Sequence, residues 1–214
     1  DPGNSNIWYL ATGEQSTFGA AVGNGVYKTI DGGTNWTQLN VQLAGDSDFV
    51  YNSSNTFLAG IYYINDIIAW DNGTSTELFI GVGGHAYGDS SSPTNWLGLQ
   101  SAGLYRSTND GANWSRIESS NMEFTNNSKT YYYIPNDFEI SANNTLWMGA
   151  VTTPVVGGGG GRIFSSTDGA TWTEAADSPL ADSNRTEIAV SATNANKLYA
   201  LTEGASTNIP HIFA

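Results

Sequence analysis

The stretch that decides the fold is TIDGGTNW, residues 29–36, which follows the apolar pair Val26-Tyr27. Its centre predicts a tight turn, because an Asp side chain bonds to nearby backbone N–H groups and Gly accepts a positive φ. Short, mostly apolar segments flank the turn. The stretch therefore predicts a β-hairpin whose return strand begins at Trp36. We expect the indole of Trp36 to cover the turn and to be largely buried.

The same pattern occurs twice more, as STNDGANW at residues 107–114 and STDGATW at residues 166–172. An aromatic residue stands two positions before each turn (Tyr27, Tyr105 and Phe164), so each hairpin has an apolar entering strand. We expect the polar turn residues to accept backbone hydrogen bonds and the tryptophans to be buried. The turn residues concerned are Asp31, Gly33 and Trp36; Asn109, Gly111 and Trp114; and Asp168, Gly169 and Trp172.

A second set of short segments precedes these hairpins. Segments that read apolar, aromatic, apolar occur at residues 8–11, 78–81, 146–149 and 198–201, and three of them follow another short strand at 65–69, 136–140 and 186–190. The repeating unit is therefore four strands long and recurs about every 50–80 residues, as the blades of a β-propeller do. The predicted fold is all-β, and residues 1–214 are expected to be part of one propeller domain, with blades near 1–41, 42–118, 119–176 and 177–214.

The three turns resemble the Asp-box, Ser/Thr-x-Asp-x-Gly-x-x-Trp, of the BNR-repeat propellers. That superfamily includes sialidases, sortilin-type receptors and xyloglucanase-type glycoside hydrolases. The first turn matches at every position; the second has Asn109 in place of Asp, and the third is one residue short after Asp168. The opening DPGNSNIWY also resembles a blade start of the sortilin-like and xyloglucanase-like group. The resemblance implies a propeller, and the box is a structural turn that identifies no active site.

The predicted strands make about three and a half blades, whereas closed propellers have about 4–8. An open arc would leave two sheet edges unpaired. We therefore expect a fragment of a larger protein, its edges met by the remainder of its own longer polypeptide, by a partner chain or by ring closure. The Asn-, Thr-, Gly- and aromatic-rich style resembles large secreted surface proteins of Bacteroidota.

Composition excludes several partners. Seven Lys and Arg against 20 Asp and Glu leave a formal net charge of −13, which is unsuited to nucleic acid. No apolar run approaches the roughly 18 residues of a membrane-spanning helix, so we expect no membrane insertion. The absence of cysteine excludes thiolate metal sites and fits an extracellular or cell-surface location. We expect no cofactor.

Connection lengths point to one binding face. The longest connections, near residues 13–24, 41–60, 83–102, 118–130 and 152–160, belong to one end of the predicted blades, and long loops persist mainly for function. The loop 83–102 carries His85, Tyr87, Asp89 and Trp96, and aromatics beside carboxylates suit stacking on sugar rings. The alternative is that Tyr87 and Trp96 only pin the loop to its blade. The chain contains only two histidines, whereas zinc normally takes three or four N, S or O ligands, so His85 is not expected to bind a metal and no metal site is predicted.

Three functional classes compete. A sialidase-type site needs an arginine triad that binds the substrate carboxylate. The four arginines here fall on predicted strands, which argues against such a site. A xyloglucanase-type hydrolase needs a carboxylate pair. Asp66 and Asp137 recur at one strand position, which favours a structural role for both. We therefore expect a non-catalytic recognition, adhesion or architectural module of a large secreted or cell-surface protein that binds a glycan or a protein, with part of a xyloglucanase-type glycoside hydrolase as the alternative.

Overall fold

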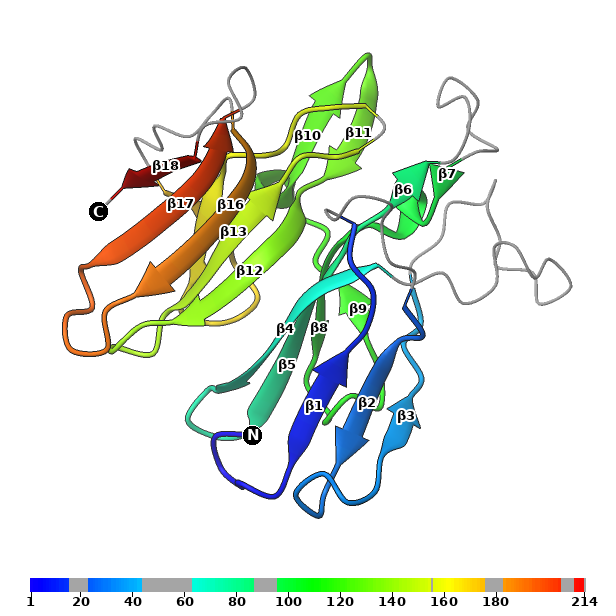
Figure 1. Ribbon diagram of the computed structural model, residues 1–214, viewed down its shortest axis with the longest axis vertical. Coiled ribbons are helices and arrows are strands. Elements are labelled where there is room, and N and C mark those ends of the chain that lie inside the picture. Colours follow the sequence, from blue (N-terminus) through cyan, green and yellow to red (C-terminus); the bar gives the residue numbers. More distant parts are fainter. Residues whose placement is uncertain are drawn as a thin grey trace, which may run out of the picture.

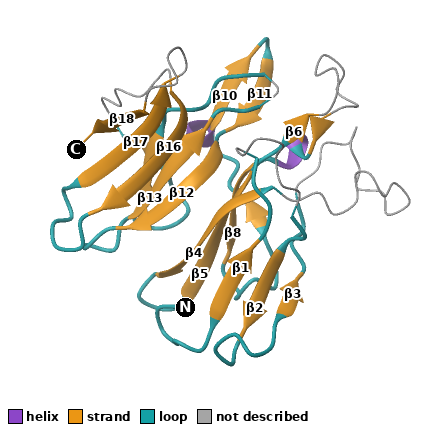
Figure 2. Cartoon of the chain, in the orientation of Figure 1, coloured by secondary structure: helices purple, strands orange, loops and turns teal. Residues whose placement is uncertain are grey.

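The computed structural model describes residues 1–15, 23–43, 63–86, 96–154, 156–175, 183–204 and 210–213. Within these ranges the chain contains no α-helix, only strands and two short 3-10 turns, Leu99–Ser101 and Ser120–Met122. Consecutive strands pair antiparallel into separate sheets that follow one another around an arc (Figure 1; Figure 2). The predicted all-β propeller architecture is confirmed.

Four sheets form the arc, and in each the strands lie in chain order. Sheet I contains β1 (Trp8–Ala11), β2 (Val26–Thr29) and β3 (Thr37–Leu39). Sheet II contains β4 (Ile64–Asp71), β5 (Thr76–Val82), β8 (Gly103–Ser107) and β9 (Ser115–Arg116), and sheet III contains β12 (Ile134–Ile140), β13 (Leu146–Val151), β14 (Ile163–Ser166) and β15 (Thr173–Glu174). Sheet IV contains β16 (Ser183–Val190), β17 (Leu198–Gly204) and β18 (Pro210–Phe213).

The first strands of successive sheets lie beside one another, with β12 in contact with both β4 and β16. Each of these strands is interrupted near its start by a register shift, between Ile64 and Asp66, between Pro135 and Asp137, and between Ser183 and Thr186. Such a bulge turns side chains in directions that a regular strand would not allow. The bulges of sheets II and III occupy the same position and that of sheet IV lies slightly earlier, so a bulge near the start of the first strand belongs to the repeat.

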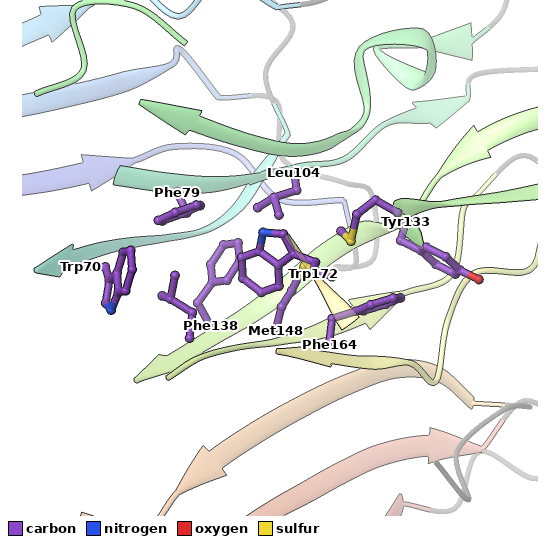
Figure 3. Packing of buried hydrophobic residues seen from close by; sticks show 11 residues of the cluster. Trp70, Phe79, Leu104, Tyr133, Phe138, Met148, Phe164 and Trp172 are labelled. Carbon is purple, nitrogen blue, oxygen red and sulfur yellow. The ribbon is translucent and has the colours of Figure 1, made fainter. Parts of the chain in front are cut away.

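The hydrophobic core lies between the sheets. Because successive side chains of a strand point to opposite faces, β5 sends Leu78 and Ile80 toward sheet I and Phe79 toward sheet III. All three are fully buried. Figure 3 shows Phe79 in one buried cluster with Phe138, Met148 and Trp172 of the next sheet. Burial on both faces explains why β5 reads as the continuous apolar run LFIGV.

The three predicted hairpin turns share one hydrogen-bond pattern. The Ser107 hydroxyl accepts from the backbone N–H of Gly111 at 2.9 Å and donates to the Asn109 side chain at 3.0 Å, and Asn109 in turn accepts from the backbone N–H of Asn113 at 2.9 Å. The turn at 29–36 repeats these bonds through Thr29 and Asp31. The shorter turn at 166–172 forms them through Ser166 and Asp168 with shifted donors.

The expectation that all three turn tryptophans are buried is wrong for Trp36. Trp114 and Trp172 are buried, because each packs against the sheet that precedes its own; Trp172 meets the Phe79 ring edge-on at 6.0 Å. Trp36 belongs to sheet I, and within the described residues no sheet precedes sheet I. It is therefore 40% exposed.

Two extra hairpins rise from the end of the sheets opposite these turns (Figure 1). One pairs β6 (His85–Ala86) with β7 (Trp96–Leu97), and the other pairs β10 (Glu123–Asn126) with β11 (Lys129–Tyr132). The aromatic run Tyr131-Tyr132-Tyr133 predicts the start of the first strand of the third blade, but Tyr131 and Tyr132 lie on β11 and that first strand begins at Ile134. The pair Asn127-Ser128, both at positive φ, makes the tight turn of the second hairpin.

No helix in the described part of the chain is long and apolar enough to cross a membrane.

Candidate functional site

Three carboxylates stand at one repeated position on the first strands. They are Asp66 on β4 and Asp137 on β12, each directly after the bulge, and Glu187 on β16, one residue further along. Their partners on the second strands of the same sheets are Gly81, Gly149 and Leu201, respectively. We call these three acids the carboxylate row. A row of half-buried acids near the centre of the arc is the strongest candidate for chemistry in the described residues.

Both aspartates of the row bond to the sheet that follows their own. Asp66 Oδ2 accepts from the backbone N–H of Phe138 at 2.8 Å, and Asp137 Oδ2 accepts from that of Ile188 at 2.6 Å. The residues before them repeat the arrangement. The side-chain amide of Asn65 donates to the Pro135 carbonyl at 3.0 Å, and that of Asn136 donates to the Thr186 carbonyl at 3.1 Å. Each Asn-Asp pair therefore ties its sheet to the next.

The glycines opposite the aspartates allow this close approach. A Cβ added to Gly81 would lie 2.6 Å from the Pro135 carbonyl oxygen, and one added to Gly149 would lie 2.6 Å from that of Thr186. Neither distance is compatible with a side chain, so the backbone of the next first strand can pack here only against glycine. In sheets II and III, the Asp and the Gly opposite it therefore act together: the Gly leaves room for the next first strand, and the Asp bonds to that strand.

The row has unusual electrostatics. Burial raises the pKa of Asp66 to about 6 and that of Asp137 to about 7, although backbone N–H donors lower both. Charge repulsion within the row and from Glu139 adds to the increase. An acid with a pKa near neutrality could exchange a proton, but both aspartates are already engaged by backbone donors of the adjacent sheet.

A second set of contacts links three sheets beside the row. The Gln15 side-chain amide donates to the Thr152 carbonyl at 3.2 Å, and its Oε1 accepts from the backbone N–H of Gly84 at 3.1 Å. Arg185 forms ion pairs with Glu187 at 2.7 Å and with Glu14 at 3.6 Å. Sequence reasoning missed Glu14, Gln15 and Arg185, since no local pattern marks a contact between residues 137 positions apart.

The residues predicted on the loop 83–102 are only partly brought together. His85 lies on β6 and pairs with Leu97, and its ring centroid is 6.3 Å from that of Tyr63. Its Nδ1 atom is buried and has no hydrogen-bond partner among the described residues. Trp96 lies on β7, opposite Ala86. Tyr87 and Asp89 lie outside the described residues. Among those residues, no three His, Asp or Glu side chains gather as a metal site would require.

The hairpin β10–β11 carries aromatic residues that were not predicted as a site. The Phe124 ring lies 5.9 Å from Tyr131 and 5.2 Å from Tyr133, and Arg116 stacks 4.1 Å from the centre of the Tyr132 ring. Asn126 donates to the Val156 carbonyl at 2.9 Å, so the hairpin is anchored to the connection that follows β13. Half-buried aromatic rings at this end of the sheets offer apolar surface for a flat ligand.

Comparisons with solved structures define the class of protein. The chain aligns over 99% of its length with a GH74 enzyme from Niastella koreensis, at 18% identity and a TM-score of 0.55. It aligns equally completely with the GH74 xyloglucanase from Xanthomonas campestris, at 15% identity and a TM-score of 0.54. The chain spans 28% and 27% of those chains, respectively. At these identities the likeness shows the fold alone, a β-propeller.

A scan against protein-family models and a search of curated protein sequences match nothing.

Proposed function

We propose that this chain is a non-catalytic recognition, adhesion or architectural propeller module of a large secreted or cell-surface protein. The observation that carries the proposal is the structural role of Asp66 and Asp137 as hydrogen-bond acceptors between adjacent sheets. Both accept backbone hydrogen bonds from the following sheet, at 2.8 and 2.6 Å. A catalytic acid or base must be free to exchange its proton with a substrate, whereas these oxygens hold sheets together.

The loop-bearing end of the sheets is the proposed binding surface. The hairpins β6–β7 and β10–β11 stand there, with His85 and Trp96 on the first and Phe124, Tyr131 and Tyr132 on the second. Aromatic faces suit sugar rings, and the rigid sheets below would hold the loops in place. A glycan, or a protein surface of similar polarity, is the ligand class that fits this composition.

One observation favours the alternative, part of a xyloglucanase-type glycoside hydrolase. The pKa of Asp137 is raised to about 7, and the general acid of such an enzyme needs a raised pKa. Xyloglucan should therefore be among the substrates tested, together with other β-linked plant polysaccharides.

The deciding experiment incubates the protein with this panel and measures both binding, by affinity electrophoresis, and release of reducing ends. We expect retardation by at least one glycan without product release. Release of product that is abolished by Asp137→Asn, in a variant with unchanged circular dichroism, would establish the hydrolase instead. Neither binding nor turnover would leave the architectural role as the one supported.

A further inference from the structure

The turn between β4 and β5 holds an Asn-Gly pair among polar groups that can promote a covalent change. Residues 71–76 read DNGTST, and this turn lies at the same end of sheet II as the hairpin turn at 107–114. In an Asn-Gly pair the backbone nitrogen of glycine can attack the side-chain amide carbon of asparagine, because glycine places no side chain in the way. The surroundings of Asn72 and Gly73 therefore decide how readily this attack occurs.

A carboxylate stands beside the attacking nitrogen. The backbone N–H of Gly73 donates to Asp71 Oδ1 at 2.8 Å, and both residues are exposed. Gly73 has a φ of 88°, and apart from its chain neighbours no described heavy atom lies within 4 Å of the place a Cβ would take. A base within hydrogen-bond reach of the proton to be removed meets the geometric condition for general base catalysis. Asp71 can therefore take the proton as the nitrogen attacks.

The carbonyl group under attack is held by three donors. Asn72 Oδ1 accepts from the backbone N–H groups of Thr74 at 2.8 Å and Ser75 at 2.9 Å, and from the Thr74 hydroxyl at 2.8 Å. Negative charge gathers on this oxygen as the nitrogen adds, and donors already in place stabilise that charge. The backbone of the turn fixes these donors, since the Asn72 N–H donates to the Ser75 carbonyl at 3.1 Å.

From this arrangement we propose that the folded turn accelerates the conversion of Asn72 to aspartate and isoaspartate. The Gly73 nitrogen forms a bond to Asn72 Cγ and gives its proton to the Asp71 carboxylate. The bond between Cγ and Nδ2 then breaks, the proton passes to the leaving nitrogen, and ammonia departs from a five-membered succinimide ring. Water adds to one of the two ring carbonyls and opens the ring. Asp71 ends the sequence as it began, so it acts as a catalytic residue.

The product changes the surroundings of a buried ion pair. Asn72 Nδ2 donates to Glu77 Oε1 at 2.8 Å, and the buried Glu77 accepts from Arg106 Nε at 2.7 Å. A carboxylate in place of the amide removes a donor to Glu77 and adds a like charge beside it. The isoaspartate form also lengthens the backbone of a turn that sheet III contacts, where Asn144 Nδ2 donates to the Asp71 carbonyl at 2.8 Å. Conversion therefore weakens the contact between sheets II and III.

The chain carries an internal control for this reaction. Asn24-Gly25 is the other of its two Asn-Gly pairs, and Gly23 precedes it where the first pair has an acid. The Asn24 side-chain amide donates to the Tyr27 hydroxyl at 2.6 Å, and Gly25 is buried. In the described part of the chain, the base and the carbonyl donors found at Asn72 have no counterpart at Asn24. The same dipeptide therefore occurs with and without the proposed catalytic groups.

Peptide mass spectrometry after incubation at neutral pH tests the proposal on the 214-residue protein. Conversion adds about 1 Da to the peptide that contains the reacting asparagine. We expect Asn72 to convert at least about 10-fold faster than Asn24 in the folded protein. We also expect Asn72 to convert at least about 10-fold faster in the folded protein than in the same protein unfolded in guanidinium chloride. Neither comparison depends on a variant.

Asp71→Asn tests the catalytic base, because the amide oxygen can still accept from the Gly73 N–H but is far too weak a base to take its proton. This variant should slow the conversion of Asn72 at least about 10-fold and leave that of Asn24 unchanged. Glu118→Gln removes a negative charge from an exposed side chain elsewhere and should change neither rate. Conversion of Asn72 that is slower in the folded than in the unfolded protein would show that the turn protects the amide, and it overturns the proposal. An undiminished rate in Asp71→Asn does the same.

Discussion

Asp66 Oδ2 accepts a hydrogen bond of 2.8 Å from the backbone N–H of Phe138, which lies 72 residues later in the chain. The same bond recurs one sheet onward, from Ile188 to Asp137 at 2.6 Å. These bonds link sheets that share no strand pairing. They make the stability of the arc depend on two half-buried carboxylates, and that dependence can be measured.

Stability should fall as the pH rises toward neutrality. The pKa of Asp137 is raised by burial from an ordinary value of 3.8 to about 7. Between these values the folded state holds a proton that the unfolded chain has lost, so the contribution is complete below about pH 4 and disappears as the pH passes 7. Urea unfolding at pH 5 and pH 8 should show the lower midpoint at pH 8.

Asp137→Asn should reduce that pH dependence, because an amide resembles the protonated acid and does not titrate. Glu118→Gln removes one charge at a side chain that is 53% exposed and serves as the control. If both variants keep the full pH dependence of the unmodified protein, the assignment to Asp137 is wrong.

Ser107→Ala should destabilise the second hairpin turn by about 1–3 kcal/mol, because it leaves the Gly111 N–H buried without its acceptor. Ser107→Thr keeps the hydroxyl, as Thr29 does in the first turn, and should cost much less. Chemical unfolding measures the difference. Equal losses for the two variants would show that the hydroxyl is not responsible.

Trp172→Ala should cost about 3–5 kcal/mol, because the ring is fully buried against Phe79 between sheets II and III. Trp36→Ala should cost less than about 1 kcal/mol, since that ring is 40% exposed. The two residues hold the same place in the repeat, so each is the control for the other. Similar costs would contradict the packing described here.

Gly149→Ala should lower stability by about 1–3 kcal/mol or prevent folding, because the added methyl group would lie 2.6 Å from the Thr186 carbonyl oxygen. Leu201→Ala changes the equivalent position of sheet IV, where a side chain is already accommodated, and should cost little. Thermal unfolding of the two variants provides the comparison. A Gly149→Ala protein of native stability would show that the sheets can separate without penalty.

The parts of the fold that follow from local chemistry could be predicted from the sequence. The hairpin turns at 29–36, 107–114 and 166–172 are held by bonds between residues two to four positions apart. The order of the strands follows from the repeat. The hairpin β10–β11 could not be predicted, because the run Tyr131-Tyr132-Tyr133 reads as the start of a blade strand and the turn at Asn127-Ser128 lacks the Gly of the usual hairpin turn.

The candidate site could be predicted only in part. The recurrence of Asp66 and Asp137 indicated a structural role, yet nothing in the sequence identified their partners. Gln15 and Arg185 carry no pattern of their own, because their contacts come from sheets brought together around the arc. Trp36 was wrongly expected to be buried, since its environment depends on which sheet stands beside its own.

The sequence by itself determined the all-β class, the four-stranded repeat and the turn geometry, because alternation and turn chemistry act over a few residues. Only the tertiary structure decided what each face of a strand meets. Gly81, Gly149 and Leu201 occupy one place in the repeat, but the difference between them matters only where a neighbouring backbone lies so close that an added Cβ would come within 2.6 Å of its carbonyl oxygen. That approach is set by the packing of whole sheets, in which each contact depends on residues distant in the chain.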